Sequence, residues 1–299
     1  MSRESAFIAR LAAFATHPAA RGLQDDAAVL SLGDRDIVLT HDMIVEGVHF
    51  LPADPPQDVA WKLVAVNLSD LAAKGARPLG VLLGFPLGDA AWDLAFADGL
   101  EAVLATFDVP LLGGDTVSAR GPRHLGLTAI GETAPGAAPA RSGAQAGDLL
   151  YVTGRIGAAG LGLAVARGER EGPAEWPAAY HHPVPRLAEG QALAPRVHAM
   201  ADISDGLLID ARRMAAASGV AIEIDLDAVP VVGEAMAAVT AGDDYELLFA
   251  APPGLTLDQP GLATITAIGR CAEGHGLALL DHGQPVPLPE ALGYEHGQD

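Results

Sequence analysis

Cysteine and lysine are almost absent from this chain. Among its 299 residues there is one cysteine, Cys271, so one copy can form no internal disulfide and no metal site built from several cysteines. Lysine occurs only at positions 62 and 74, and Lys+Arg total 18 against 38 Asp+Glu, a formal net charge of -20. A nucleic-acid-binding protein needs a basic surface to neutralise phosphates, so we expect no nucleic-acid partner.

Long apolar segments are missing too. No uninterrupted apolar run approaches the roughly 18 residues that a membrane-spanning helix needs. The first residues, Met1-Ser-Arg-Glu-Ser, are charged where a secretion signal requires an apolar core. Phe7, Ile8, Leu11 and Phe14 are instead spaced for one face of an amphipathic helix. With the lone cysteine, these features favour a cytoplasmic protein with no membrane partner.

Several common catalytic motifs are absent. There is no Gly-x-x-x-x-Gly-Lys-[Ser/Thr] phosphate loop, no protein-kinase motif set, no His-Glu-x-x-His and no Gly-x-Ser-x-Gly. The segment Gly157-Ala-Ala-Gly-Leu-Gly162 has its glycines in the wrong order for a dinucleotide loop, so it predicts a tight turn from a strand into a helix.

The remaining composition is that of a globular protein: 50% of the residues are hydrophobic and 19% are charged. The length favours two domains. A Gly-, Ala- and Pro-rich segment, 131–143, predicts a linker between them. Both halves mix strands and helices, which indicates an α/β or α+β protein. The predicted strands are 37–40, 79–83, 125–130, 149–153, 197–202 and 220–226, and the predicted helices are 57–74, 90–107, 157–167 and 206–218.

Aspartates recur beside apolar residues or glycine, where a charged side chain is costly unless it is paired or binds a metal. On the helix predicted over 57–74, Asp70 shares an apolar face with Leu63, Asn67 and Leu71. A metal ligand or an i,i+4 pair with Lys74 would explain it equally well. Six such segments occur: Gln24-Asp25-Asp26, Thr40-His41-Asp42, Asn67-Leu-Ser-Asp70, Gly113-Gly114-Asp115, Asp202-Ile-Ser204-Asp205 and Gly242-Asp243-Asp244-Tyr-Glu246.

Two of these segments also have local structural interpretations. Ser204 or Asp205 could cap the N-terminus of the helix that follows, or the helix start could bind phosphate beside metal-binding aspartates. Gly113-Gly114-Asp115 could form a turn, or its glycines could let the backbone approach a phosphate while the aspartate holds a cation. Oxygen ligands of this kind favour Mg²⁺ over zinc.

Taken in order, these strings resemble the thiamine-monophosphate kinase family of the AIR-synthase-like (PurM-like) ATP-binding superfamily. The resemblance spans about Phe7 to Tyr294 and is most specific in Val45-Glu-Gly-Val-His49-Phe50. It implies a two-domain fold: an N-terminal α/β domain, residues 1–135, whose strands pair across a homodimer, and a C-terminal α+β domain, residues 136–299. It also implies ATP-dependent phosphorylation of thiamine monophosphate to thiamine diphosphate with several Mg²⁺ ions.

The resemblance also implies roles for individual residues. Asp26, Thr40, His41, Asp42, Asp70, Asp115, Asp202 and Asp205 would form the metal shell; Gly114, Asp115, Arg141 and Ser204 would contact ATP; and His49, Asp243 and Tyr294 would contact the thiamine phosphate. A histidine that merely packs and an aromatic anchor for the C-terminus are the structural alternatives for His49 and Tyr294. No catalytic residue is expected beyond the metal shell, because a phosphate oxygen is already anionic near neutral pH.

This chain departs from the family pattern at two positions. Asp243 stands where the family usually has the longer glutamate, and Lys74 stands where it often has methionine. Lys74 could be a solvated helix residue. Other functions stay open: another enzyme of the superfamily such as AIR synthase, a non-catalytic Mg-nucleotide-binding protein, or a plain interaction domain. A selenophosphate synthetase is disfavoured because no cysteine precedes Asp25, and a hydrogenase-maturation protein because the chain ends Gly-Gln-Asp.

Overall fold

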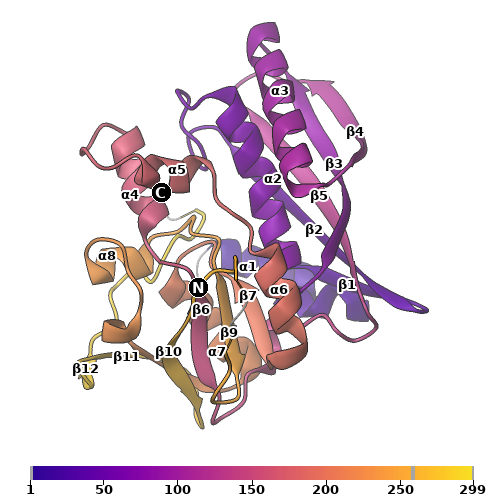
Figure 1. Cartoon of the computed structure of the whole chain (residues 1–299). Coiled ribbons are helices and arrows are strands. Elements are labelled where there is room, and N and C mark those ends of the chain that lie inside the picture. The colour runs from indigo at the N-terminus through magenta and orange to yellow at the C-terminus, as the bar shows by residue number, and fades with distance from the viewer. Residues whose placement is uncertain (1–2, 257–259, 298–299) are drawn as a thin grey trace.

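The protein is built around two β-sheets that follow one another along the chain (Figure 1). The structure is a computed structural model, and it describes residues 3–256 and 260–297. All strands of the first sheet lie between residues 28 and 133, and all strands of the second lie between 149 and 286. The segment that joins them contains a short 3-10 turn, Arg141–Gly143.

The first sheet has the strand order β1-β2-β5-β3-β4. Its strands pair antiparallel except β3 with β4, which are parallel and are therefore joined by a crossover helix, α3 (Ala90–Phe107). Asp89 caps α3, its side chain accepting a hydrogen bond from the backbone N–H of Trp92 at 2.9 Å. The strands are β1 (Ala28–Leu32), β2 (Arg35–Val45), β3 (Arg77–Leu87), β4 (Leu111–Ser118) and β5 (His124–Thr133).

Helix α2 (Pro56–Ala73) is the element that both halves share. It packs against α3, β2 and β5 of the first half, and against α5 (Glu175–His181), α6 (Leu187–Leu193) and β7 (Ala199–Asp202) of the second. For this reason nearly every residue from Val59 to its end is buried, charged ones included. A helix enclosed in this way presents polar side chains to several neighbours at once, so its polar residues meet groups from both sheets.

The second sheet has the strand order β12-β11-β8-β10-β6-β9-β7. Helix α7 (Leu207–Ser218) contributes buried residues to its core, beside residues of β6, β8 and β9. Its strands are β6 (Leu149–Thr153), β7 (Ala199–Asp202), β8 (Ala221–Asp225), β9 (Leu247–Ala251), β10 (Ile265–Ala272), β11 (Gly276–Asp281) and β12 (Gln284–Val286). The other helices of this half are α4 (Ala158–Ala166), α5 (Glu175–His181), α6 (Leu187–Leu193) and α8 (Ala235–Thr240).

Most elements expected from the sequence are present, with a few corrections. The helix over 90–107 and the strand over 149–153 are confirmed with the same bounds. Residues 131–133 of the expected linker belong to β5. Of the two alternatives for Gly113-Gly114, the turn is wrong, because both glycines lie within β4. A Cβ atom on Gly114 would lie 2.0 Å from the carbonyl oxygen of Leu83, so the glycine allows β4 to approach β3.

The N-terminal helix forms as α1 (Arg3–Ala12), but none of its residues is buried, and Phe7 and Phe14 remain largely exposed. Across residues 3–256 and 260–297, no helix is both long enough and apolar enough to cross a bilayer.

Candidate active site

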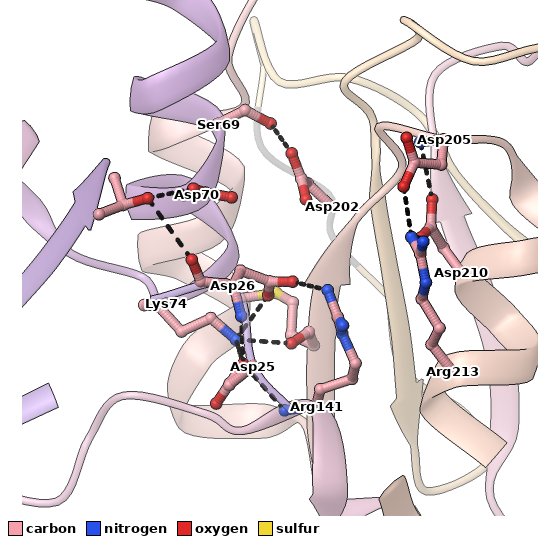
Figure 2. Close-up of polar contacts among 12 residues, drawn as sticks. Asp25, Asp26, Ser69, Asp70, Lys74, Arg141, Asp202, Asp205, Asp210 and Arg213 are labelled. Carbon is pink, nitrogen blue, oxygen red and sulfur yellow. Dashed lines mark hydrogen bonds and ion pairs between the residues drawn. The ribbon is translucent and has the colours of Figure 1, made fainter. Parts of the chain in front are cut away.

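Three aspartates from distant parts of the sequence meet between the two sheets (Figure 2). Asp26 lies just before β1, Asp70 in the last turns of α2, and Asp202 at the end of β7. Each offers one carboxylate oxygen, and these oxygens all lie within 4.8 Å of one another. The group has the spacing and the oxygen ligands of a site for a hard divalent cation.

Strand β2 brings two more predicted residues to the same place. Alternation along the strand puts Thr40 and Asp42 on one face. The Thr40 hydroxyl donates a hydrogen bond to the carboxylate of Asp70. The backbone N–H of Asp42 donates to Oδ1 of Asn67, 3.0 Å away on α2. These contacts fix β2 against the helix that carries Asp70.

The carboxyl groups of Asp42, Asp70 and Asp202 are held in an environment that disfavours their charge. Burial, together with the negative charges of Asp205 and Asp26, raises the pKa of Asp42 to about 6. Burial and the neighbouring aspartates raise the pKa of Asp70 well above its usual range. The pKa of Asp202 rises in the same way, although the Ser69 hydroxyl donates a 2.7 Å hydrogen bond to it. Positive charge placed here would stabilise all three carboxylates.

Asp26 has the opposite balance. Burial by itself would raise its pKa, but the charges of Arg141 and Lys74 outweigh burial and lower it. Nζ of Lys74 lies 2.8 Å from Asp26 and 2.5 Å from Asp25, and it also donates to the carbonyl oxygen of Met200 at 3.0 Å. Arg141 forms an ion pair with Asp26 from the turn that joins the two halves.

These contacts correct two expectations about Lys74. It is fully buried, so it is not a solvated helix residue. Its ion pairs are with Asp25 and Asp26, so the expected pair with Asp70 does not form. The reason is that α2 ends at Ala73, and Lys74 is the C-cap residue with non-helical backbone angles. The i,i+4 geometry of a continuous helix therefore does not apply to it.

Asp205 lies at the start of the segment that leads into α7. Its carboxylate pairs with Nη1 of Arg213 at 2.5 Å, and the same guanidinium lies 2.8 Å from Asp210. Of the two alternatives for Ser204 and Asp205, capping of α7 is wrong: the cap residue is Gly206, and no side chain caps the helix. Ser204, in the same segment, accepts a backbone hydrogen bond from Asp243 at 2.8 Å through its carbonyl oxygen.

The three residues assigned to the thiamine phosphate gather on one side of this region. The ring of His49 lies 5.3 Å from that of His296, which packs edge-on against Tyr294 at 4.8 Å. Burial, followed by the nearby His296, lowers the pKa of His49. Lys62 links His49 to Asp243, because its Nζ lies 2.9 Å from the His49 carbonyl oxygen and 2.8 Å from Oδ2 of Asp243.

Three residues of the predicted site are not brought to the acidic cluster. The side chain of His41 lies on the opposite face of β2, where Nδ1 is 2.9 Å from the Thr128 hydroxyl. Gly114 and Asp115 lie on β4, at the edge of the sheet. The strand pairing places Asp115 three strands away from Met43, the neighbour of Asp42 on β2, which is about 14 Å at ordinary strand spacing. Their predicted roles stay predictions.

Sequence reasoning missed several residues that shape this region. Lys62 had a signal, since it is one of only two lysines and interrupts an apolar run of α2. Ser69 and Asp25 lie within the strings that pointed to the site but were given no role. Asp210 and Arg213 had no signal, because two charges one helical turn apart are common on exposed helices.

Known proteins match this chain over most of its length. Residues 24–133 match the N-terminal domain of the AIR synthase related protein family, and residues 145–278 match its C-terminal domain. Thiamine-monophosphate kinase of Salmonella typhimurium is 39% identical over 92% of this chain and 91% of its own. The Caulobacter vibrioides protein of the same name is 39% identical over 94% of this chain and 86% of its own.

Solved structures show the same fold. AaThiL, complexed with AMPPCP and TMP, superposes with a TM-score of 0.85 at 28% identity, covering 98% of this chain and 96% of that one. Thiamine-monophosphate kinase from Stenotrophomonas maltophilia K279a gives a TM-score of 0.74 at 35% identity, covering 89% and 95%.

The chain belongs to the AIR synthase related family, and its two sheets are the cores of the two PurM-like domains. Within that family it belongs with the thiamine-monophosphate kinases, so it is an enzyme of the kinase class. The resemblance and the fold class expected from the sequence are confirmed. The boundary between residues 135 and 136 stays a prediction.

Proposed function

We propose that the chain transfers the γ-phosphoryl group of ATP to the phosphate of thiamine monophosphate, giving ADP and thiamine diphosphate. The observation that carries the proposal is the meeting of Asp26, Asp70 and Asp202 between two domains of a family whose relatives are named for this reaction. The complex of AaThiL with AMPPCP and TMP supports a site that takes an ATP analogue and a thiamine phosphate together.

The donor set fits Mg²⁺. All the converging side-chain ligands are oxygens, and burial, followed by the neighbouring aspartates, raises the pKa values of Asp70 and Asp202. Asp26, Asp70 and Asp202 would hold the ions, with the Thr40 hydroxyl beside them and Asp42 near enough to act on the charges of Asp70 and Asp202. Bound there, Mg²⁺ would offset the charge that builds up on the transferred phosphoryl group and its acceptor.

The residues of the chain then act by holding and orienting. An anionic phosphate oxygen needs no general base, so the chain supplies none at the cluster. Cys271 is no candidate for a covalent intermediate, since it is buried on β10 and burial raises its pKa to about 12. Arg141, already beside Asp26, and Ser204 are the candidate ATP contacts. Direct in-line transfer is the mechanism that these groups support.

A homodimer is part of the same proposal. Strand β4 is an edge strand exposed along its whole length, and it displays Leu111, Leu112 and Val117. An apolar edge strand is a site of association unless another chain covers it. We infer that a second copy covers it, and sedimentation should give twice the chain mass, with Val117→Lys shifting the protein toward monomer. We propose a cytoplasmic location as well, since the phosphoryl donor of the proposed reaction is ATP.

The test of the reaction is a direct product assay. Purified protein is incubated with ATP, Mg²⁺ and thiamine monophosphate, and ADP and thiamine diphosphate are measured together by chromatography. The same mixture with thiamine as acceptor, and one with EDTA, are the controls. Equal amounts of ADP and thiamine diphosphate, with none in either control, support the proposal. Nucleotide binding without product would favour a non-catalytic Mg-nucleotide-binding protein.

A further inference from the structure

Lys62 is a buried cation whose contacts lie outside the acidic cluster. Its side chain is 2% exposed on α2, and its ammonium group has three protons to donate. Nζ lies 2.9 Å from the carbonyl oxygen of His49, 2.8 Å from Oδ2 of Asp243, and 4.1 Å from the centre of the Tyr180 ring. Burying a charge this deeply is costly unless such partners compensate it.

The partners of Lys62 come from separate segments of the chain. His49 follows β2 in the first half, Asp243 precedes β9 in the second, and Tyr180 belongs to α5. One ammonium group therefore contacts residues of both domains at this point. It also connects His49 with Asp243, two of the three residues proposed to contact thiamine monophosphate.

Contacts within the chain hold both the backbone and the carboxylate of Asp243. Its backbone has a positive φ of 70°, which few non-glycine residues adopt, and its N–H donates to the carbonyl oxygen of Ser204 at 2.8 Å. Oδ2 faces Lys62, while Oδ1 accepts a 3.1 Å hydrogen bond from the Tyr245 hydroxyl. The Asp243 side chain is 27% exposed, against 2% for Lys62. Of the two groups in this ion pair, the carboxylate is therefore the one that a ligand can reach.

We propose that Lys62 is a positioning residue for thiamine monophosphate, acting by holding the carboxylate of Asp243 and the backbone at His49 in their binding geometry. The inference rests on the proposed function. Lys62 draws the carboxylate of Asp243 to a fixed place and balances its charge. Asp243 then offers a hydrogen-bond acceptor to the substrate without adding net negative charge beside a phosphate.

The test compares Lys62→Met with Lys62→Arg, Asp243→Asn and the double variant Lys62→Met/Asp243→Asn. We expect Lys62→Met to raise KM for thiamine monophosphate tenfold or more, with KM for ATP and kcat changed less than threefold. Lys62→Arg should recover at least part of the loss, because a guanidinium still donates to Asp243. The double variant should be no worse than the worse single variant, since Lys62 acts through Asp243.

Tyr180→Phe is the matched control, because it keeps the ring under Lys62 and removes only the hydroxyl that donates to Asp54. Its KM values should not change. If Lys62→Met lowers only the melting temperature, or if the two losses multiply in the double variant, the inference is overturned. Calorimetric binding of thiamine monophosphate separates the two claims: a wild-type chain that binds it without turnover contradicts the kinase proposal, while the variants still test Lys62.

Discussion

The two sides of the acidic cluster are neutralised in different ways. Asp25 and Asp26 form the cation-paired group, in contact with Lys74 and Arg141. Asp42, Asp70 and Asp202 form the cation-free group: within residues 3–256 and 260–297, no basic side chain makes an ion pair with them. The pKa of Asp26 is lowered, whereas the pKa values of the cation-free group are raised.

The difference predicts where a cation from solution would bind. The side chain of Asp26 is buried, as are Asp70 and Asp202, so burial alone cannot explain the opposite pKa directions. What differs is the presence of a fixed positive charge. The cation-paired group is satisfied by the chain itself, whereas the cation-free group gains most from a divalent ion. We therefore expect a metal ion to bind chiefly at Asp42, Asp70 and Asp202, with Asp26 at the border between the groups.

The largest expected effect follows from removing a ligand of the cation-free group. Asp202→Asn keeps the shape and can still accept the Ser69 hydrogen bond, but it takes away one anionic ligand. Turnover should fall by about 10³-fold or more at saturating Mg²⁺, because charge neutralisation is the main catalytic contribution here. Without metal, the free energy of unfolding of Asp202→Asn should equal or exceed that of the wild type. Normal steady-state turnover in Asp202→Asn would contradict the assignment.

In the cation-paired group, loss of a basic side chain should chiefly lower the free energy of unfolding. Lys74→Met leaves Asp25 and Asp26 buried with one cation fewer, a change that costs about 3–5 kcal/mol when a buried pair is broken. Urea unfolding without metal should show the loss, and Mg²⁺ should restore more stability to the variant than to the wild type. The matched control is Arg270→Met, which removes the exposed pair with Glu223 and should cost less than about 1 kcal/mol.

A third expectation concerns pH. The pKa of Asp42 in the folded chain is about 6, above the ordinary carboxyl value of 3.8. The stability that its protonation contributes is therefore full below about pH 4 and is lost as pH rises through 6. The metal-free Asp42→Asn variant should gain stability relative to wild type over that interval, by roughly 3 kcal/mol at most. Denaturant titrations at pH 4.5 and 7.5 measure this, and a difference that does not grow with pH would contradict it.

The smallest effect is expected outside both groups. The ring of Tyr294 is half-exposed at the edge of the region, so its truncation should barely change the melting temperature. Stacking on a cationic heterocycle contributes about 0.5–2 kcal/mol, so Tyr294→Ala should raise KM for thiamine monophosphate by up to about thirtyfold. KM for ATP and the Mg²⁺ dependence should stay unchanged. A fall in melting temperature alone would make Tyr294 a packing residue.

The sequence was sufficient to identify the aspartate-containing segments as candidate metal ligands and to predict most of the strands and helices beside them. Asp202-Ile-Ser204-Asp205 follows a recognisable strand, and the residue types by themselves indicate oxygen ligation. Their convergence could not be derived from spacing, because Asp26, Asp70 and Asp202 lie on three elements that only the tertiary fold brings together.

The errors have the same origin. Asp70 is buried with Leu63 and Leu71 as expected, but a single apolar face does not predict that α2 is buried on nearly all sides. Ser69 is directed to Asp202 and Asp70 to Thr40. Lys74 was paired by helical spacing, but the helix ends one residue earlier and tertiary contacts decide its partners. Local rules predicted the elements, and failed where a side chain reaches a residue distant in the sequence.

The chain offers a built-in comparison for the central claim, that the buried cluster binds the metal. Asp227, Asp281 and His282 also lie within 4.8 Å of one another, but they are exposed. The most direct measurement is Mn²⁺ binding, followed by electron paramagnetic resonance of the free ion, in wild type, Asp202→Asn and Asp281→Asn. The account predicts that Asp202→Asn loses at least one bound ion or weakens it at least tenfold, while Asp281→Asn binds like wild type. Unchanged binding in Asp202→Asn, with loss in Asp281→Asn, would contradict it.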